Sequence, residues 1–169
     1  MTLRAWRIVK RKHSKDAFSG EGARQFGGRW NSPGVPVVYT AEHVSLAVLE
    51  ILVHVEHTGL LADYVLFQVD FDEGLAEILE QSALPRNWRS YPAPLSLRSI
   101  GDQWVADGRS AVLSVPSAVV PLERLFLLNP QHPAFPRIKV GKPQPFSFDA
   151  RLVSGHPRSA TEPPRPARR

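Results

Sequence analysis

The chain has 169 residues, of which 43% are hydrophobic, and it carries a net charge of +5 at pH 7. This length and apolar content suit one folded domain with its own core. The sequence contains no cysteine, which excludes disulfide bonds, thiolate zinc sites and cysteine nucleophiles. No apolar run approaches the roughly 18 residues that a membrane helix needs, and the first residues lack the apolar stretch of a secretion signal. We therefore expect a cytoplasmic protein without a membrane partner.

The positive charge is concentrated near the C-terminus. Residues 154–169 hold four arginines and one glutamate, whereas residues 1–153 carry 17 basic and 15 acidic side chains, a net charge of +2. The last stretch is also rich in proline and has almost nothing to bury. We therefore predict a folded domain over 1–153 and a disordered tail over 154–169. We expect no direct contact with nucleic acid, although a basic nucleic-acid-binding module stays an alternative.

The first part of the chain predicts two strands and a helix. Residues 4–10 alternate in character, as a half-buried strand does, and residues 35–40 form a β-branched strand. Residues 11–27 between them are charged, glycine-rich and aperiodic, which indicates a loop. From residue 41 to about 57 the pattern is that of a mostly apolar helix, which is typical of a helix inside the fold.

The second part is dominated by strands. Residues 64–71 form the clearest strand, residues 74–81 a short helix or turn, and residues 95–108 a helix that ends at a glycine. Further strand material is expected over 111–121 with an interruption at Pro116, over 123–130 and over 137–149. Helices and strands do not alternate regularly, so we predict an α+β fold in a single domain, with mixed or antiparallel strands and a few helices.

Two arginines stand out by their settings. Arg29 follows two glycines, which permit unusual backbone angles and the close approach of a ligand. Its planar guanidinium suits phosphate or carboxylate; the alternative is a surface arginine in a hairpin. Arg7 lies between Trp6 and Ile8, and alternation places it on the opposite face of the strand. That face is either solvent or a cleft.

Glu50 and Ser117 are the other candidates. Glu50 lies among apolar neighbours in the helix, where a carboxylate is costly to bury unless it is paired. It is therefore either functional or at a helix edge that reaches solvent. Ser117 follows the strand break at Pro116, so it is either presented at a kink or merely structural. Glu50, His54 and His57 share a helix, but their spacing matches no zinc motif, and we predict no metal site.

The sequence resembles the RES domain family, which is named for an arginine, a glutamate and a serine. The matching stretches are FSGEGARQFGGRWNSPGVPVVYTAEHVSLAVLEILVH (18–54), VPSAVVP (115–121) and LLNPQHP (127–133). They follow the family's order over nearly the whole chain except the tail. The naming residues match Arg29, Glu50 and Ser117, and Arg7 and Tyr39 match further positions of the family's cleft.

The resemblance implies a fold like that of ADP-ribosyltransferases and a toxin of a bacterial type II toxin–antitoxin system. Such toxins consume NAD⁺ by cleaving its nicotinamide–ribose bond, by phosphorolysis to ADP-ribose 1″-phosphate or by hydrolysis, so NAD⁺ is a substrate and no cofactor is expected. Transfer of ADP-ribose to a protein is the alternative. The implied partner is a helix-turn-helix antitoxin that blocks the cleft, and a homo-oligomer with that antitoxin stays open.

The residue chemistry agrees with this implied reaction. Arg29 and Arg7 suit the diphosphate or an incoming phosphate, and the ring of Tyr39 suits the nicotinamide or ribose. Cleavage of the glycosidic bond builds positive charge on the sugar, which the carboxylate of Glu50 would stabilise. Ser117 is expected to donate a hydrogen bond to ribose or phosphate rather than to act as a nucleophile. Two neighbours of Arg29 complete the predicted NAD⁺ site, namely Gly28 and Asn31.

Overall fold

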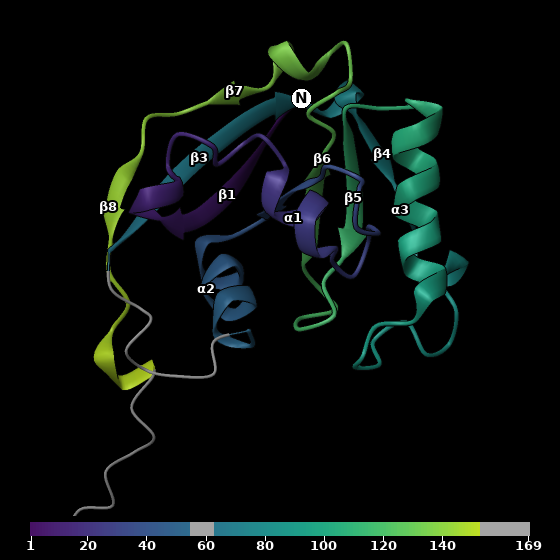
Figure 1. Ribbon diagram of the computed structural model, residues 1–169, viewed down its shortest axis with the longest axis horizontal. Helices are drawn as coiled ribbons and strands as arrows, with labels where there is room; N and C mark the ends of the chain where they lie inside the picture. Colours follow the sequence, from purple (N-terminus) through teal and green to yellow (C-terminus); the bar gives the residue numbers. More distant parts are fainter. Residues whose placement is uncertain (55–62, 153–169) are drawn as a thin grey trace, which may run out of the picture.

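A mixed β-sheet forms the centre of the computed structural model, which describes residues 1–54 and 63–152 (Figure 1). The strands lie in the order β4-β5-β6-β2-β1-β3-β7, with β8 also paired to β3. Among the strand pairs of these described residues, β4–β5 is the parallel one and the others are antiparallel. The bounds are β1 (Thr2–Lys10), β2 (Val38–Ala41), β3 (Tyr64–Asp72), β4 (Ala76–Ile78), β5 (Val112–Pro116), β6 (Arg124–Leu128), β7 (Lys139–Val140) and β8 (Gln144–Phe146).

The sheet is nearly divided between β1 and β2. β1 pairs with β3 from Thr2 to Lys10, but its register with β2 consists of Trp6 opposite Ala41 alone. β2 in turn pairs with β6 over its whole length. The two strands therefore separate on one side of that single pair, and the backbone groups beyond it need other partners.

Three α-helices flank the sheet in the described part of the chain, with α1 and α2 near its centre and α3 beside β4 and β5 (Figure 1). α2 packs against β1 and β2. The bounds are α1 (Glu21–Phe26), α2 (Val44–Leu52) and α3 (Leu95–Asp107). Short 3₁₀ turns are η1 (Arg11–His13), η3 (Glu73–Leu75), η4 (Gln81–Ala83), η5 (Phe135–Arg137) and η6 (Ala150–Leu152). No helix of the described ranges combines the length and hydropathy that a bilayer crossing requires.

The main core cluster lies between the sheet and the helices. It contains Leu46 of α2, Leu97 and Trp104 of α3, and Trp30 of the loop after α1, all of which are almost completely buried. A second cluster includes Phe71 of β3 and Phe126 of β6, whose rings meet edge to face. The sheet is thus covered on both faces, and residues that approach the β1–β2 gap are held by a packed surround.

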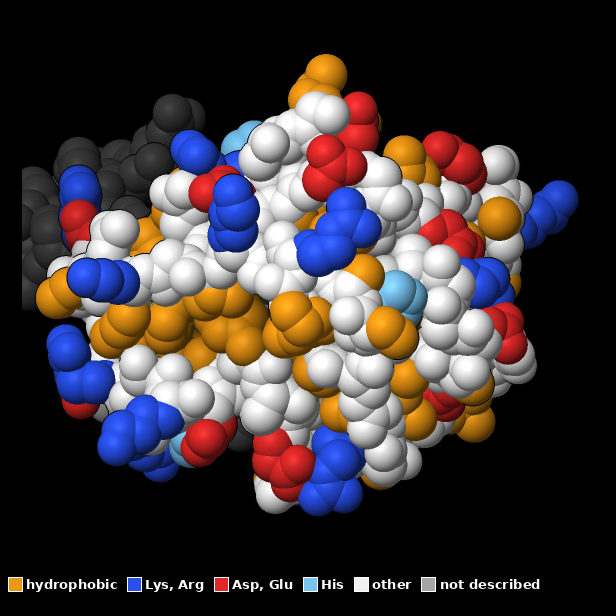
Figure 2. Space-filling model, turned by 90° about the horizontal axis from the view of Figure 1, so that it is seen from above, with side chains coloured by type: hydrophobic (Ala, Val, Ile, Leu, Met, Phe, Trp, Pro, Cys, Tyr) orange, Lys and Arg blue, Asp and Glu red, His pale blue; other side chains and the backbone are white. Residues whose placement is uncertain are grey.

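On the surface, positive and negative side chains are interspersed. The face drawn in Figure 2 shows lysines and arginines beside aspartates and glutamates around a band of hydrophobic side chains. Several of the arginines are paired, as Arg4 is with Asp70 and Arg109 is with Glu77. The net positive charge therefore does not gather into one continuous basic surface on this face.

The structure confirms the predicted α+β class and most of the predicted elements. The helix expected over 95–108 is α3 with Gly108 as its cap. Observed strands overlap the predicted ranges 4–10, 35–40, 64–71 and 123–130, with ends that differ by up to three residues. The helix expected from residue 41 is shorter than predicted: α2 spans Val44–Leu52, and a turn follows it. Its predicted end at His57 and the predicted tail over 154–169 lie outside the described residues.

Three predictions are wrong in detail. The loop expected over 11–27 contains helix α1. The segment 74–81, expected to be a short helix or turn, contains strand β4, which forms because it pairs with β5, a strand much later in the sequence. The strand expected to resume after Pro116 does not, because Ser117 instead turns the backbone. Its Oγ accepts hydrogen bonds from the backbone N–H groups of Val119 and Val120.

Helix α3 holds the loop that follows α1. The Arg98 side chain donates to the carbonyl of Gly28 at 3.1 Å, and Asp102 accepts from the backbone N–H of Ser32 at 2.8 Å. Between them, Gly101 lets the backbone of Trp30 lie directly on the helix, since a Cβ at position 101 would overlap the Trp30 carbonyl oxygen. The loop that carries Gly28 and its neighbours is therefore fixed to α3 at three points.

We expect Gly101→Ala to lower the free energy of unfolding by about 2–3 kcal/mol or more, because neither backbone can move away without breaking the flanking hydrogen bonds. Urea denaturation measures this loss. Gly22→Ala is the matched control, because nothing lies within 4 Å of a Cβ there. In helix α1 that change should be neutral or stabilising, by up to about 1 kcal/mol. Equal stability of both variants would contradict the packing described.

Candidate active site

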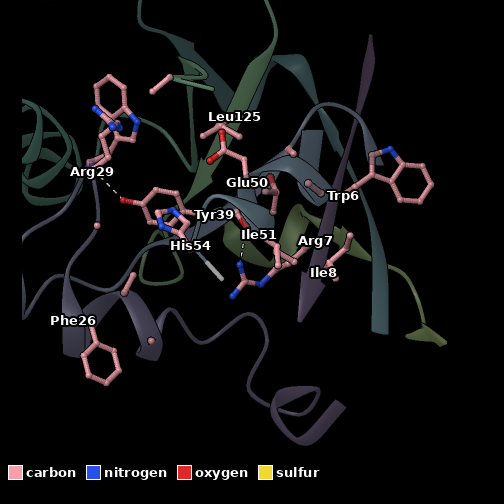
Figure 3. Close-up of a pocket in the computed structure, with 18 of the residues that line it drawn as sticks. Trp6, Arg7, Ile8, Phe26, Arg29, Tyr39, Glu50, Ile51, His54 and Leu125 are labelled. Carbon is pink, nitrogen blue, oxygen red and sulfur yellow. Dashed lines mark hydrogen bonds between the residues drawn. The ribbon is translucent and has the colours of Figure 1, made fainter. Parts of the chain in front are cut away.

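A cavity of about 520 Å³ opens where β1 and β2 separate. Its size is in the range of small-molecule sites. The walls are the middle of β1, helix α1 with the glycines after it, β2, the inner face of α2, and Ala118 after β5 (Figure 3). Five of the seven predicted site residues line it, namely Arg7, Gly28, Arg29, Tyr39 and Glu50.

Arg7 bridges the separated strands from inside the cavity. Its Nη1 donates to the carbonyl of Tyr39 on β2, and its Nε donates to the carbonyl of Ala17, both at 2.7 Å. Burial lowers the pKa of Arg7 to about 10, so the side chain stays positively charged at neutral pH. Of the two settings that the sequence left open, solvent or cleft, the structure shows the cleft.

Tyr39 presents its ring to the cavity while its hydroxyl is held behind the wall. The hydroxyl donates to Asn31 Oδ1 at 2.7 Å and accepts from the backbone N–H of Trp30 at 3.1 Å. Burial raises the pKa of Tyr39 above its usual range. Gly28 is required by close approach, because a Cβ there would press on the Tyr39 hydroxyl, whereas Gly27 has a positive φ of 70°.

Asn31 lies outside the cavity. It is fully buried, and its amide donates to the carbonyls of Ala23 at 2.8 Å and Val35 at 3.0 Å while its oxygen accepts from Tyr39. Both the amide nitrogen and the amide oxygen therefore have partners within the protein. The geometry gives Asn31 the role of fixing the loop and Tyr39, and its predicted contact with substrate stays a prediction.

Arg29 is anchored to the loop that precedes α3. Its Nη1 donates to the carbonyls of Trp88 at 2.8 Å and Ser90 at 3.1 Å. Burial lowers the pKa of Arg29, and the nearby carboxylate of Glu50 acts in the opposite direction. A guanidinium that is held at one nitrogen can present the others to an anionic ligand.

Glu50 points from α2 into the cavity and is supported by Ser117. The Ser117 hydroxyl donates to Glu50 Oε1 at 2.8 Å. Burial raises the pKa of Glu50, while the Ser117 hydrogen bond and the charges of His54 and Arg29 lower it. The second carboxylate oxygen has no hydrogen-bond donor among the described residues and faces the cavity with Tyr39 and Arg29 nearby (Figure 3).

Ser117 itself is completely buried and is absent from the cavity wall. Its only proton goes to Glu50, and its oxygen accepts two backbone N–H groups. The geometry thus makes Ser117 a positioning residue for the carboxylate. From the sequence we expect Ser117 to donate a hydrogen bond directly to ribose or phosphate. In the structure its proton goes to Glu50 instead, and the direct contact with substrate stays a prediction.

Three residues that the structure brings to the site or its supporting loop have no role in the predictions from sequence. His54 lines the cavity. From the sequence it was considered only as a metal ligand, together with Glu50 and His57. Arg98 and Asp102 hold the loop, and their four-residue spacing on a predicted helix was the available signal. Among residues 1–54 and 63–152, no three acidic or histidine side chains converge as metal ligands; His57 lies outside those ranges.

Comparison with known proteins gives a match over most of the chain. The model of a family described as RES domain matches residues 4–149. A protein named Toxin Res from Yersinia enterocolitica is 40% identical over 148 residues, which cover 87% of this chain and 97% of the relative. A protein named Prs ADP-ribosylating toxin from a Sphingobium species is 40% identical over 158 residues, covering 90% and 98%.

A solved structure shares the fold. It is the crystal structure of the Mycobacterium tuberculosis MbcT–MbcA toxin–antitoxin complex, with a TM-score of 0.72 and 20% identity, and the match covers 90% of this chain and 87% of that chain. The M. tuberculosis protein named NAD(+) phosphorylase MbcT is 50% identical to this chain over 38 residues, or 22% of this chain and 20% of that protein. The structural match supports the α+β fold.

We expect Ser117→Ala to raise the pKa of Glu50 further, because the hydrogen bond that stabilises the charged form is lost. A ¹³C NMR titration of the Glu50 carboxyl measures the change directly. Ser45→Ala is the control, since Ser45 is exposed on the same helix. A Glu50 pKa that is the same in the Ser117→Ala variant as in the wild type would show that the serine does not act on the carboxylate.

Glu50 is also expected to cost stability at neutral pH. Its folded-state pKa is raised, so the folded protein binds this proton more tightly than the unfolded chain. The free energy of unfolding therefore falls as pH rises from the unfolded pKa through the folded one. Glu50→Gln should melt at a higher temperature than the wild type at pH 7, and the difference should vanish below about pH 4.

Glu77→Gln makes the same chemical change at a surface carboxylate that pairs with Arg109. This control should gain no stability at pH 7. If Glu50→Gln melts below the wild type at pH 7, or if its advantage persists in acid, the cost assigned to the Glu50 charge is wrong.

Proposed function

The chain belongs to the RES domain family, and on this premise we propose that it is the toxin of a toxin–antitoxin pair that cleaves the nicotinamide–ribose bond of NAD⁺. The observation that carries the proposal is the Glu50 carboxylate, which is fixed by Ser117 and faces a cavity that also presents Arg7, Arg29 and the ring of Tyr39. Among the described residues, the cavity wall combines one carboxylate with two arginines, which is the charge pattern that a sugar cation linked to a diphosphate requires.

The bond to be broken dictates where the negative charge must lie. When the C1″–N bond breaks, its electron pair moves to the nicotinamide nitrogen, which becomes neutral, and positive charge develops on the ribose. A carboxylate beside the sugar stabilises that charge, and it does so more strongly in a partly dehydrated cavity than in water. Glu50 has one oxygen held by Ser117 and a second oxygen available to the ribose.

The other cavity residues suit the rest of the substrate. Arg7 and Arg29 stand on different walls, each held to backbone carbonyls by Nη1, and they offer charge-assisted bonds to the diphosphate. The Tyr39 ring offers a flat surface to the nicotinamide or ribose. Because the leaving nicotinamide is neutral, departure requires no strong general acid, and the described cavity residues need only bind, orient and stabilise charge.

The acceptor of the ADP-ribosyl group is the finer part of the proposal. We propose inorganic phosphate, which gives ADP-ribose 1″-phosphate, and the name of the MbcT relative as an NAD(+) phosphorylase supports this choice. Transfer to a protein is the second candidate, favoured by the name of the Sphingobium relative as an ADP-ribosylating toxin. The same cavity would serve either reaction, since only the acceptor differs.

The proposed partner is an antitoxin that covers the cavity. The solved relative is a toxin–antitoxin complex, which supports a partner of this kind. Phe26 lines the cavity and is 79% exposed, so an apolar side chain is available at its rim. The helix-turn-helix type expected from the sequence, and any homo-oligomer formed with the antitoxin, stay predictions.

To test the reaction, purified protein is incubated with NAD⁺, with and without phosphate, and the products are identified by mass spectrometry. We expect nicotinamide and, with phosphate present, ADP-ribose 1″-phosphate. Glu50→Gln should lower the rate by at least about 100-fold, because a charge placed for the transition state is lost. Glu77→Gln is the control and should keep wild-type activity. A fully active Glu50→Gln variant would refute the proposed mechanism.

A further inference from the structure

His54 is a cavity-lining residue to which the proposed cleavage assigns no role. It lies in the turn after α2, two residues beyond Leu52 and four beyond Glu50, and both side chains line the cavity. Figure 3 draws its ring among the residues that line the cavity. The His54 side chain is exposed, and its ring makes no hydrogen bond to any residue of the described ranges.

The two arginines of the cavity differ from His54 in this respect. Arg7 uses Nε and Nη1 on the carbonyls of Ala17 and Tyr39, and Arg29 uses Nη1 on the carbonyls of Trp88 and Ser90. Both guanidiniums are therefore anchored parts of the wall. Among the described residues of the cavity wall, His54 is the basic side chain that no hydrogen bond anchors to the protein.

The position beside Glu50 poses a problem for an anionic acceptor. Phosphate must reach the anomeric carbon, and the Glu50 carboxylate next to that carbon repels it. A protonated imidazole at position 54, on the wall of the same cavity, offsets the repulsion where the acceptor has to arrive. Glu50 and His54 line the same cavity, so a phosphate bound there meets both groups.

We propose that His54, as a cation, binds the acceptor phosphate and thereby favours phosphate over water. This rests on the proposed cleavage of NAD⁺. A phosphate oxygen forms the bond to C1″ as the C1″–N electron pair leaves with nicotinamide, and the hydrogen phosphate dianion becomes a monoester without transfer of a proton. Water would have to release a proton in the same step, which a protonated imidazole cannot accept.

The test is steady-state kinetics with His54→Gln, with inorganic phosphate varied at saturating NAD⁺. The KM for phosphate should rise by about tenfold or more, as expected for a lost charged hydrogen bond. The KM for NAD⁺ should change much less, and products should shift from ADP-ribose 1″-phosphate toward ADP-ribose. His54→Lys restores the charge and should recover most of the phosphate affinity, which a purely structural role would not allow.

His43→Gln is the matched control, because His43 caps the start of the same helix, pairs with Glu123 and does not line the cavity. It should keep the wild-type KM for phosphate. An unchanged KM for phosphate in His54→Gln, or a wild type that cleaves NAD⁺ with no dependence on phosphate, would overturn the inference while leaving NAD⁺ cleavage intact. Failure of the wild type to release nicotinamide would overturn the proposed function itself.

Discussion

The structure depends on the early end of the ladder between β1 and β2. Beyond the pair of Trp6 and Ala41 the strands separate, and the Arg7 side chain replaces the missing backbone partners by donating to the carbonyl of Tyr39. A continued ladder would close the space that the cavity occupies. The same interaction therefore holds the sheet together and leaves a positive charge in the opening.

A second layer of buried polar groups keeps the cavity residues in place. Ser117 orients Glu50, Asn31 holds the Tyr39 hydroxyl, and Gly101 lets α3 support the loop of Arg29. The side chains of Ser117 and Asn31 make their hydrogen bonds inside the protein, whereas Glu50, Arg29 and His54 line the cavity. This division between support and cavity is the arrangement that a preorganised site needs.

The sequence was sufficient for the fold class and for most strands, because periodicity and glycine positions are local signals. It also drew attention to Glu50, since an acid in an apolar helix is anomalous wherever the helix lies. It could not show that Ser117 faces Glu50, because 67 residues separate them along the chain. The sequence also did not predict strand β4, because a segment of three residues has no clear periodicity and forms a strand here by pairing with the distant strand β5.

In the proposed complex, the nicotinamide ribose of NAD⁺ lies against Glu50 between β1 and β2. A crystal structure of the Glu50→Gln variant with NAD⁺ tests this most directly, because substrate should survive in the crystal. We predict C1″ of that ribose beside residue 50, with the diphosphate between Arg7 and Arg29. NAD⁺ bound elsewhere, or bound with its adenosine end against residue 50, would contradict the account.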